Sequence, residues 1–560
     1  MLPGEKRFGK DFIMGISVRL LSSLEKVFID ELPEADEYNC ASALCGESFS
    51  FQIAFNQKDE ERLYFNLFYE SGLPCYINLF EVKNVPVTLP CYHSHDADYL
   101  RTAPGLYPDI LEPVNPNDFQ LVYNQWKSLW VNVRLPRNIN PGKYSITIGI
   151  KGGNITVSKV FTLNVLNAAL PEPQMIFTQW FHCDCLASYY KCSIFSEEHW
   201  RIIEDYMKNA TEFGMNMIMV PLLTPPLDTF VGGERPTVQL VNITIDDSGY
   251  HFGFEKLKKY IKTALKCGFK YFEINHLFTQ WGAAHAPKVV AYENGVEKRI
   301  FGWKTNHDDA EYVDFLKKLL TAVKAELKEL GVFEHCFFHI SDEPNFNSIE
   351  NYRKNINNLK EVLSDCHTID ALSDYEFYKE GLVKHPIPST DHIEPFLKNN
   401  VPGLWTYYCC CQENIVSNHF ISMPGARTRA LATALYKYNI TGFLHWGYNF
   451  YYSQLSRGLI DPFYEVSAIN AFPAGDAFIV YPGADGKPIS SQRQYLMLEV
   501  MQDIRAMQLL ESLTDRKTVL SIIEKYGEIS FTKYPKQSEQ ILKIRSEINC
   551  AIAGQFQNKK

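Results

Sequence analysis

The sequence has no excess of positive charge and no long basic run. Its 560 residues include 55 Lys and Arg against 65 Asp and Glu, which gives a formal net charge of −10. Proteins that bind nucleic acids usually gather Lys and Arg on one face to neutralise the phosphates. The composition therefore argues against a nucleic-acid partner.

The sequence also lacks an apolar run that could serve as a signal peptide or a membrane span. Residues 1–10 are polar and charged, and residues 12–21 are interrupted by Gly15, Ser17 and Arg19. A signal-peptide core needs about 7–15 apolar residues and a membrane helix about 20. We therefore expect a cytoplasmic protein that has no membrane partner.

The 14 cysteines do not form a regular framework. In a long chain without an export signal we expect them to be reduced thiols. The run Cys409-Cys410-Cys411 and the pair Cys183 and Cys185 lack the spacing of zinc sites. No glycine-rich phosphate loop follows a predicted strand. We therefore expect no metal and no cofactor.

Residues up to about 165 show the period of two that is typical of half-buried strands. Apolar side chains alternate along 129–135, 144–150 and 161–165. Short alternating strands separated by turns are typical of an antiparallel β-sandwich. We predict such a domain over residues 1–168, followed by a linker with prolines at 171 and 173.

After the linker the pattern changes to strand and then helix, repeatedly. One example is the apolar helical face from Trp200 to Phe213, with Ser196 as a cap and Gly214 as a stop. About eight such alternations over some 330 residues favour a (β/α)8 TIM barrel over a doubly wound sheet. We predict an α/β fold, with the barrel over residues 172–513 and a short helical C-terminal extension over 514–560. The predicted barrel strands are 175–180, 215–222, 270–278, 336–341, 367–372, 403–409, 442–446 and 477–480.

The fourth predicted strand runs out into Asp342, Glu343 and Pro344. In a (β/α)8 barrel the carboxyl ends of the strands carry the chemistry, so the acids would lie at a functional site. A solvated turn or a helix cap is the alternative interpretation, since Asp and Pro are common there. Adjacent strand residues point to opposite faces, so these two carboxylates are poorly placed to flank one bond.

The other predicted strand ends carry aromatic rings and polar side chains. Rings stack on the apolar faces of sugars and carboxyl groups act on the glycosidic oxygen, so this set favours a carbohydrate site. Any single ring is equally consistent with ordinary packing. The candidate residues are His182, His276, Trp281, Trp405, Tyr407, Tyr408, Trp446, Tyr448 and Asn449, with Asp184, Glu273 and Asp370 as further acids.

The acids leave the mechanism open. A retaining glycosidase with its own nucleophile needs two carboxylates about 5 Å apart. Asp-Glu-Pro is similar to the Asn-Glu-Pro acid/base motif of a large clan of retaining barrel glycosidases, whose nucleophile is a Glu at the end of the seventh strand. The seventh predicted strand and its end, 442–449, contain no acid. Substrate assistance needs only one acid/base and one residue that holds a 2-acetamido group, which suits an adjacent Asp-Glu pair.

Several motifs occur in a specific order along the chain. They include Trp180-Phe181-His182-Cys183-Asp184, His276 to Gly282, Ser341-Asp342-Glu343-Pro344, Trp405-Thr406-Tyr407-Tyr408, Gly442 to Asn449 and Gly475 to Gly483. Together, over about 126–513, they resemble the catalytic domain of glycoside hydrolase family 123 with that family's N-terminal sandwich.

The resemblance implies an exo-acting β-N-acetylgalactosaminidase that uses the acetamido-assisted route through an oxazoline. Glu343 would be the general acid/base and Asp342 would stabilise the oxazoline. Tyr407 or Tyr408 would support the acetamido pocket, and Trp446 and Asn449 would line the sugar subsite. The substrate would be an oligosaccharide or glycoconjugate with a terminal β-linked N-acetylhexosamine.

Two other functions remain open at this point. One is a retaining glycosidase that acts on a sugar without the acetamido group, with Glu273, Asp184 or Asp370 as nucleophile. The other is a non-catalytic glycan-binding protein that kept the barrel.

Overall fold

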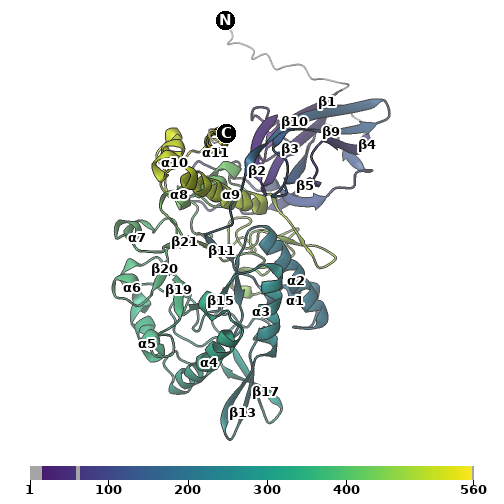
Figure 1. The fold of residues 1–560 in the computed structure, drawn as a ribbon. Helices are drawn as coiled ribbons and strands as arrows, with labels where there is room; N and C mark the ends of the chain where they lie inside the picture. The colour runs from purple at the N-terminus through teal and green to yellow at the C-terminus, as the bar shows by residue number, and fades with distance from the viewer. Residues whose placement is uncertain (1–14, 59–62, 558–560) are drawn as a thin grey trace.

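A computed structural model describes residues 15–58 and 63–557 (Figure 1). Within this range, the N-terminal part consists of two five-stranded sheets. One sheet has the strand order β1 (Ile16–Ser22), β3 (Ser48–Gln57), β8 (Trp126–Arg134), β5 (Ile77–Val87) and β6 (Gly105–Pro113). The other has the order β2 (Cys40–Cys45), β10 (Ile155–Ala169), β9 (Gly142–Gly152), β4 (Leu63–Ser71) and β7 (Phe119–Leu121).

Apolar side chains from both sheets fill the space between them, as the period of two predicts. Phe51 of β3 and Phe161 of β10 stack with their ring centroids 4.0 Å apart. Strand pairing in this part is antiparallel except between β2 and β10, which run parallel. The prediction of a purely antiparallel sandwich therefore needs correction. The segment 23–39 carries the chain from β1 in one sheet to β2 in the other.

The second part of the chain contains parallel strands that alternate with helices. In the part of the chain that the structure describes, these strands form two sheets, ordered β12-β15-β18-β19-β20 and β11-β22-β21. The edges of the two sheets meet. The backbone N–H of Asn216, just before β12, donates to the carbonyl of Phe177 in β11 at 3.1 Å, and Ser389 and Tyr407 form a parallel bridge between β20 and β21. The strands are β11 (Ile176–Gln179), β12 (Met217–Val220), β15 (Tyr271–Ile274), β18 (Cys336–His339), β19 (His367–Ala371), β20 (His385–Ile387), β21 (Trp405–Tyr407) and β22 (Gly442–His445).

Helices follow most of these strands and begin and end where local chemistry predicts. The hydroxyl of Ser196 accepts the N–H of His199 at the start of α2, and Gly214 takes a φ of +93° after its end. The helices are α1 (Cys183–Tyr190), α2 (Glu197–Glu212), α3 (Glu255–Cys267), α4 (Ala310–Glu329), α5 (Ile349–Leu359), α6 (Tyr375–Lys379), α7 (Glu394–Lys398) and α8 (Gly425–Lys437).

One predicted strand is wrong and one real strand is missed. Residues 477–480 are not a strand; they are a buried loop, in which Ile479 donates to the carbonyl of Tyr448 and Phe450 donates to the carbonyl of Ala477. Burial of the loop, rather than sheet pairing, accounts for its apolar composition. The sixth parallel strand is instead β20, whose three residues include Pro386 and show no alternation. Residues 403–409 and 442–446 therefore supply the seventh and eighth strands.

The remaining strands and 3-10 turns lie outside the two parallel sheets. A separate sheet has the order β14 (Gly249–Gly253), β13 (Asn242–Asp246), β16 (Val289–Glu293) and β17 (Val296–Phe301), and β23 (Tyr481–Pro482) pairs with β24 (Pro488–Ile489). Short 3-10 turns are η1 (Phe333–His335), η2 (Phe346–Ser348), η3 (Gln454–Ser456) and η4 (Glu524–Tyr526). Within residues 15–58 and 63–557, none of the helices combines the length and the apolar character needed to cross a bilayer.

The C-terminal helices connect the two parts of the chain. They are α9 (Gln492–Leu513), α10 (Arg516–Ile523) and α11 (Ser538–Gln557). Arg429 of α8 pairs with Asp503 of α9 at 2.7 Å, and Arg545 of α11 pairs with both Asp503 and Glu47 of the sandwich at 2.6 Å. These buried ion pairs tie the helical extension to both parts of the molecule.

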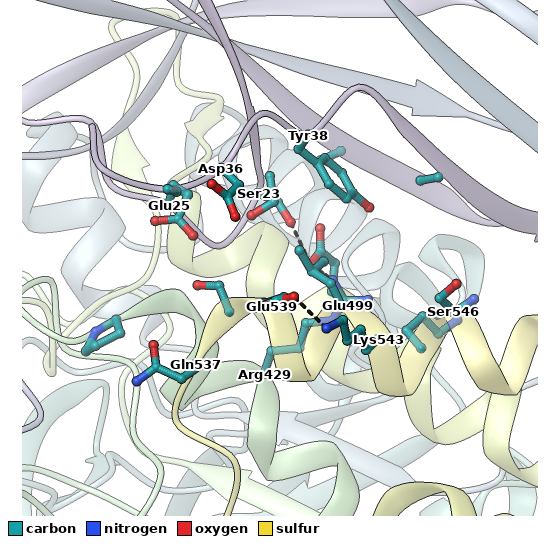
Figure 2. A pocket seen from close by; sticks show the side chains of 18 of the residues that line it. Ser23, Glu25, Asp36, Tyr38, Arg429, Glu499, Gln537, Glu539, Lys543 and Ser546 are labelled. Atoms are coloured by element: carbon teal, nitrogen blue, oxygen red, sulfur yellow. Dashed lines mark hydrogen bonds and ion pairs between the residues drawn. The ribbon is translucent and has the colours of Figure 1, made fainter. Parts of the chain in front are cut away.

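A hollow of about 860 Å³ lies between the sandwich and these helices (Figure 2). Its walls carry several polar and charged side chains, among them Tyr38, Arg429, Glu499 and Lys543. Arg429 binds Glu499 at 2.7 Å, and Lys543 and Glu539 form an ion pair at 2.5 Å. Because these charges are neutralised by each other, we assign this hollow to the contact between the two parts rather than to catalysis.

Candidate active site

The acid pair lies immediately beyond the end of β18. Asp342 accepts a hydrogen bond from the backbone N–H of Trp281 at its carbonyl, at 2.8 Å, and Glu343 donates its own N–H to the carbonyl of Ala371 at the end of β19, at 3.0 Å. Glu343 has a φ of +43°, a left-handed conformation that side chains with a Cβ rarely adopt. Such strain persists where the surrounding structure holds it, and it often marks a functional position.

A cavity of about 100 Å³ opens above the acids. Of the candidate residues, it brings together Asp342, Glu343, Trp281, Tyr407 and Trp446. Trp180 and Gln280, which belong to the motifs quoted from the sequence, also line the cavity, together with four residues that the sequence did not single out for the site, namely Asp228, Cys409, Cys410 and Phe472. Most of these come from loops that follow the parallel strands, so the cavity lies at the carboxyl edge of the sheets. This cavity is smaller than the hollow beside the sandwich, but it is the one that carries carboxyl groups at strand ends.

Burial raises the pKa of both acids above the usual values. For Asp342 the charge of Glu343 adds to the effect of burial. For Glu343, hydrogen bonds from the side chains of Tyr407 and Trp281 lower the pKa but do not cancel the effect of burial. The Tyr407 hydroxyl lies 2.6 Å from Glu343 Oε1. Since the two carboxyl groups repel each other when both are ionised, the pair retains a proton at a pH at which isolated carboxyl groups would have lost theirs.

A second acidic cluster lies next to the cavity and is paired with a buried histidine. The fully buried ring of His339 donates from Nε2 to Glu273 at 2.5 Å and from Nδ1 to Asp370 at 3.2 Å. Burial lowers the pKa of His339, but the hydrogen bonds that its ring donates to Asp370 and Glu273 outweigh this effect and raise the pKa to about 9. We therefore assign an imidazolium between two carboxylates.

Further donors complete the partners of these carboxylates. Glu273 accepts from the Trp180 indole at 2.7 Å and from the Thr178 hydroxyl at 2.9 Å. Asp370 accepts from the Tyr352 hydroxyl and from the backbone N–H of Ile340. Neither acid lines the cavity. These hydrogen bonds give Glu273 and Asp370 a supporting position rather than the position of a nucleophile.

The tandem tyrosines point in different directions. Tyr407 reaches the cavity, whereas Tyr408 is buried and donates its hydroxyl to Met497 Sδ at 3.2 Å. The possibility that Tyr408 faces the site is therefore corrected in favour of Tyr407. Trp405 lies among apolar side chains below the cavity, where its ring packs over Gly442. A Cβ on Gly442 would lie only 2.1 Å from that ring, so this position needs a glycine.

Two other candidates on the last strand end also lie outside the cavity. The hydroxyl of Tyr448 donates to Asn209 at 2.7 Å and its ring stacks on Phe181, away from the acids. Asn449 binds the backbone of His182 through both ends of its amide, at 2.9 and 3.1 Å. These contacts fix the loops of β11 and β22 to each other, so we correct the expectation that either side chain lines the sugar subsite.

The two candidate histidines are buried beside the cavity and do not line it. His182 contacts the carbonyl of Trp446 at 2.9 Å and accepts from Arg235 at 3.2 Å. Burial and the charge of Arg235 lower its pKa to about 3, so the ring is neutral. His276 stacks on His339 with centroids 4.3 Å apart, and its ring nitrogens have no hydrogen-bond partner among the described residues. His182 therefore packs against Trp446, and His276 packs against His339.

Asp228 is the acid that sequence reasoning missed. It lines the cavity, has a φ of +42°, and accepts the N–H of Leu455 at 2.8 Å. Burial raises its pKa to about 6. Asp184, which was considered as a nucleophile, is instead bound by Arg235 at 2.7 Å and 2.8 Å and lies outside the cavity. No local signal distinguished Asp228, because it lies in a loop and its partner is over two hundred residues away.

Comparisons with known proteins identify the family. The family model "Glycoside hydrolase 123, catalytic domain" matches residues 180–510, more than half of the chain. A family 123 glycoside hydrolase from Clostridium perfringens aligns with a TM-score of 0.73 and 16% identity, covering 97% of this chain and 98% of that one. An endo-β-1,4-mannanase from Thermotoga petrophila gives a TM-score of 0.34 at 14% identity, covering 60% of this chain and 77% of that one.

A β-glucuronidase from Parabacteroides merdae gives a TM-score of 0.30 at 10% identity, covering 80% of this chain and 49% of that one. No curated protein sequence matches the chain significantly. At 16% identity the structural likeness to the Clostridium enzyme concerns the fold, and the family assignment comes from the match over residues 180–510. The chain belongs to glycoside hydrolase family 123.

Proposed function

We propose that the protein is an exo-acting β-N-acetylhexosaminidase that prefers N-acetylgalactosamine and uses a substrate-assisted, retaining mechanism. The observation that carries this proposal is the placement of Asp342 and Glu343 side by side in one cavity whose walls include Trp180, Trp281 and Trp446. Indole rings offer flat apolar faces on which a sugar ring can stack. The two acids supply the polar groups that the reaction needs.

In the first step the acetamido oxygen of the substrate attacks its own anomeric carbon, and the bond to the leaving oxygen breaks. Glu343 donates its proton to that oxygen, and an oxazolinium ion forms. Asp342 accepts a hydrogen bond from the acetamido N–H, which increases the electron density on the attacking oxygen. In the second step Glu343 takes a proton from water, the water oxygen bonds to the anomeric carbon, and the acetamido group is regenerated with net retention.

The electrostatics of the cavity suit this division of roles. A general acid must hold its proton near the working pH, and burial raises the pKa of Glu343 in that direction. Tyr407, 2.6 Å from Glu343, orients the carboxyl group and can stabilise its ionised form after proton transfer. Burial and the charge of Glu343 raise the pKa of Asp342, and the positive charge of His339 opposes that rise. In the proposed mechanism the acetamido N–H adds a further donor that favours an ionised Asp342 once substrate is bound.

The family assignment and the fold support a glycan substrate. The Clostridium perfringens relative is described in terms of glycolipid glycan hydrolysis, and we extend to this chain only the idea of a glycoconjugate with a terminal β-linked N-acetylhexosamine. We also infer that the parallel strands close into a (β/α)8 barrel over residues 172–513, preceded by the sandwich over 1–168 and followed by the extension over 514–560. The meeting edges of the two parallel sheets support this inference.

A retaining glycosidase with a protein nucleophile is the second candidate, and Asp228 is the observation that favours it. Asp228 is a carboxyl group in the same cavity as Glu343. In this alternative Asp228 would attack the anomeric carbon of a sugar that lacks the acetamido group. A 2-fluoro sugar would then trap a covalent adduct on Asp228, detectable by peptide mass spectrometry.

Hydrolysis of a panel of 4-nitrophenyl glycosides tests the proposal. The panel comprises the β-GalNAc, β-GlcNAc, β-Gal and β-Glc derivatives, with Glu343→Gln as the control enzyme. We expect turnover of the acetamido sugars alone, fastest for β-GalNAc and lost in the variant. Turnover of β-Gal or β-Glc at similar rates would favour the Asp228 alternative, and binding of glycans without any turnover would favour a binding protein.

A further inference from the structure

Three consecutive cysteines lie together at the rim of the cavity. Residues Cys409, Cys410 and Cys411 follow β21, and their Sγ atoms all lie within 4.8 Å of one another. The sulfurs of Cys410 and Cys411 are 3.8 Å apart. Cys409 and Cys410 contribute to the cavity wall, whereas Cys411 is exposed to solvent and does not. The cluster therefore joins the substrate cavity to the protein surface.

Hydrogen bonds hold the turn that brings these sulfurs together. Gln412 Oε1 accepts the backbone N–H of Cys409 at 2.9 Å and its thiol at 3.2 Å. Gln412 Nε2 in turn donates to Asp391 at 3.0 Å. Asn418 donates to the carbonyls of both Cys409 and Gln412, at 2.9 and 3.0 Å. The thiols are thus presented by a fixed backbone, so ligand binding requires little reorganisation.

The spacing of the sulfurs suits a tetrahedral thiolate site. With Zn–S bonds of about 2.3 Å and tetrahedral angles, two thiolates lie about 3.8 Å apart, which matches the Cys410–Cys411 separation. The spacing of these cysteines along the chain does not match known zinc motifs, but the turn after β21 places the three consecutive thiols close together. The exposed Cys411 provides an entry path and leaves room for water as the fourth ligand.

We propose that Cys409, Cys410 and Cys411 bind one thiophilic divalent cation of the zinc and cadmium type, and that the bound ion inhibits glycoside hydrolysis. Soft thiolates select such ions over Mg²⁺ or Ca²⁺. Binding releases the thiol protons to solvent as sulfur–metal bonds form, with no change of oxidation state. Inhibition follows because two of the three ligands belong to the wall of the small cavity that holds Glu343. The inhibition, but not the binding, rests on the proposed function.

Binding is tested with Cd²⁺ alone, added to the full-length protein under a non-chelating phosphine reductant. We expect an ultraviolet sulfur-to-cadmium charge-transfer band that saturates at one equivalent. Cys411→Ser should weaken binding by more than about 100-fold, since loss of even a hydrogen-bond partner of a ligand costs about 10–100-fold. Cys550→Ser is the matched control, because Cys550 is also an exposed free thiol but lies on α11; it should bind Cd²⁺ as the wild type does.

The activity measurement separates binding from inhibition. One equivalent of Zn²⁺ should lower kcat/KM of the wild type and of Cys550→Ser by about tenfold or more, a change of about 1.4 kcal/mol, and EDTA should restore it. Cys411→Ser, compared with its own metal-free rate, should resist Zn²⁺. A charge-transfer band that is unchanged in Cys411→Ser would overturn the site, as would its absence in the wild type. Binding without inhibition would leave the site and overturn the inhibitory role.

If the glycoside panel shows no turnover at all, the cadmium titration still decides the metal site, so failure of one proposal is distinguishable from failure of the other. A disulfide within the cluster is the remaining outcome. Mass spectrometry of protein kept without reductant would show a loss of two hydrogens in a peptide containing residues 409–411. If Cd²⁺ fails to bind even after full reduction, the metal proposal is overturned, and a disulfide in that peptide would then identify the cluster as a redox pair.

Discussion

Two carboxylate clusters lie near the end of β18, one around His339 in that strand and one at Asp342 and Glu343 just beyond it, and only the first is paired with a buried cation. Glu273 and Asp370 surround the His339 imidazolium and accept hydrogen bonds from several further donors. Asp342 and Glu343 face a cavity and have raised pKa values. Buried carboxylates that are paired with a cation and hydrogen-bonded suit a supporting role, whereas carboxyl groups with raised pKa values that line a cavity are typical of acid catalysis.

The comparison shows that closeness to Asp342 and Glu343 along the sequence does not tell which side chains contact these acids in the cavity. His339 precedes Asp342 by three residues, yet its ring is fully buried and both of its nitrogens are hydrogen-bonded to Asp370 and Glu273. Tyr407 is 64 residues away from Glu343 and contacts it directly. If this comparison is sound, substitutions in the two clusters should affect different properties.

Glu343→Gln should have the largest effect and should lower the rate without lowering the stability of the fold. General acid/base catalysis contributes about 10²–10⁴-fold, so kcat should fall by about that factor, and by more for an alkyl aglycone than for 4-nitrophenol. The folded protein should be as stable as the wild type or more stable, because the substitution removes a buried carboxyl group whose pKa is raised on folding. Steady-state kinetics and urea unfolding measure the two effects. A variant that keeps full activity would contradict the assignment.

His339→Gln should mainly affect stability. It leaves Glu273 and Asp370 without their cation, and breaking a buried ion pair costs about 3–5 kcal/mol. The pH dependence supplies a second readout. Because folding raises the pKa of His339 from 6.5 to about 9, its contribution is fully present below pH 6.5 and is lost as the pH rises through about 9.

Urea unfolding at several pH values checks this prediction. The free energy of unfolding of the wild type should fall between pH 6.5 and about pH 9, and that of His339→Gln should not show this decrease. If the variant is as stable as the wild type and has reduced kcat alone, the cluster around His339 would belong to the catalytic machinery, and the comparison would fail.

Tyr407→Phe should have an intermediate effect. A hydrogen bond to a charged group is worth about 1.5–3 kcal/mol, so we expect kcat/KM to fall by roughly tenfold to a hundredfold. The Tyr407 hydroxyl lowers the pKa of Glu343, and its removal should raise that pKa further. The rate falls on the alkaline side as Glu343 loses its proton, so this limb of the pH–rate profile should move to higher pH. A shift to lower pH would argue against the contact.

Tyr408→Phe should have the smallest effect and is the matched control for its neighbour. Its hydroxyl contacts Met497 and His419, at 3.2 and 2.8 Å, and not the cavity. We expect kcat/KM to change by less than about threefold and stability to fall by about 1 kcal/mol, the usual value of one hydrogen bond. A large loss of activity with an unchanged unfolding midpoint would mean that the tandem tyrosines exchange roles when substrate binds.

Much of the fold could be predicted because its signals are local. Ser196 and Gly214 mark the ends of α2 by their own chemistry, and the run from Cys336 to the acids indicates a strand that ends at a site. β20 could not be predicted, because three residues that include Pro386 carry no periodic signal.

The parts of the site that escaped prediction depend on contacts between distant residues. Adjacent tyrosines give no local sign of which ring meets Glu343, and the structure places Tyr407 there. Asp228 was missed because the Leu455 N–H that fixes it lies far away in the chain. Tyr448 and Asn449 look like sugar ligands in a motif, but long-range packing turns them toward Asn209 and His182.

The most direct test of the account is the response of the rate to fluorine in the substrate's own acetamido group. Successive fluorination of the methyl group of 4-nitrophenyl β-GalNAc withdraws electron density from the carbonyl oxygen and makes it a poorer nucleophile. If that oxygen attacks the anomeric carbon while Asp342 holds the N–H, kcat/KM should fall steeply with each fluorine. A rate that is nearly independent of fluorination would contradict substrate assistance and would point to a protein nucleophile such as Asp228.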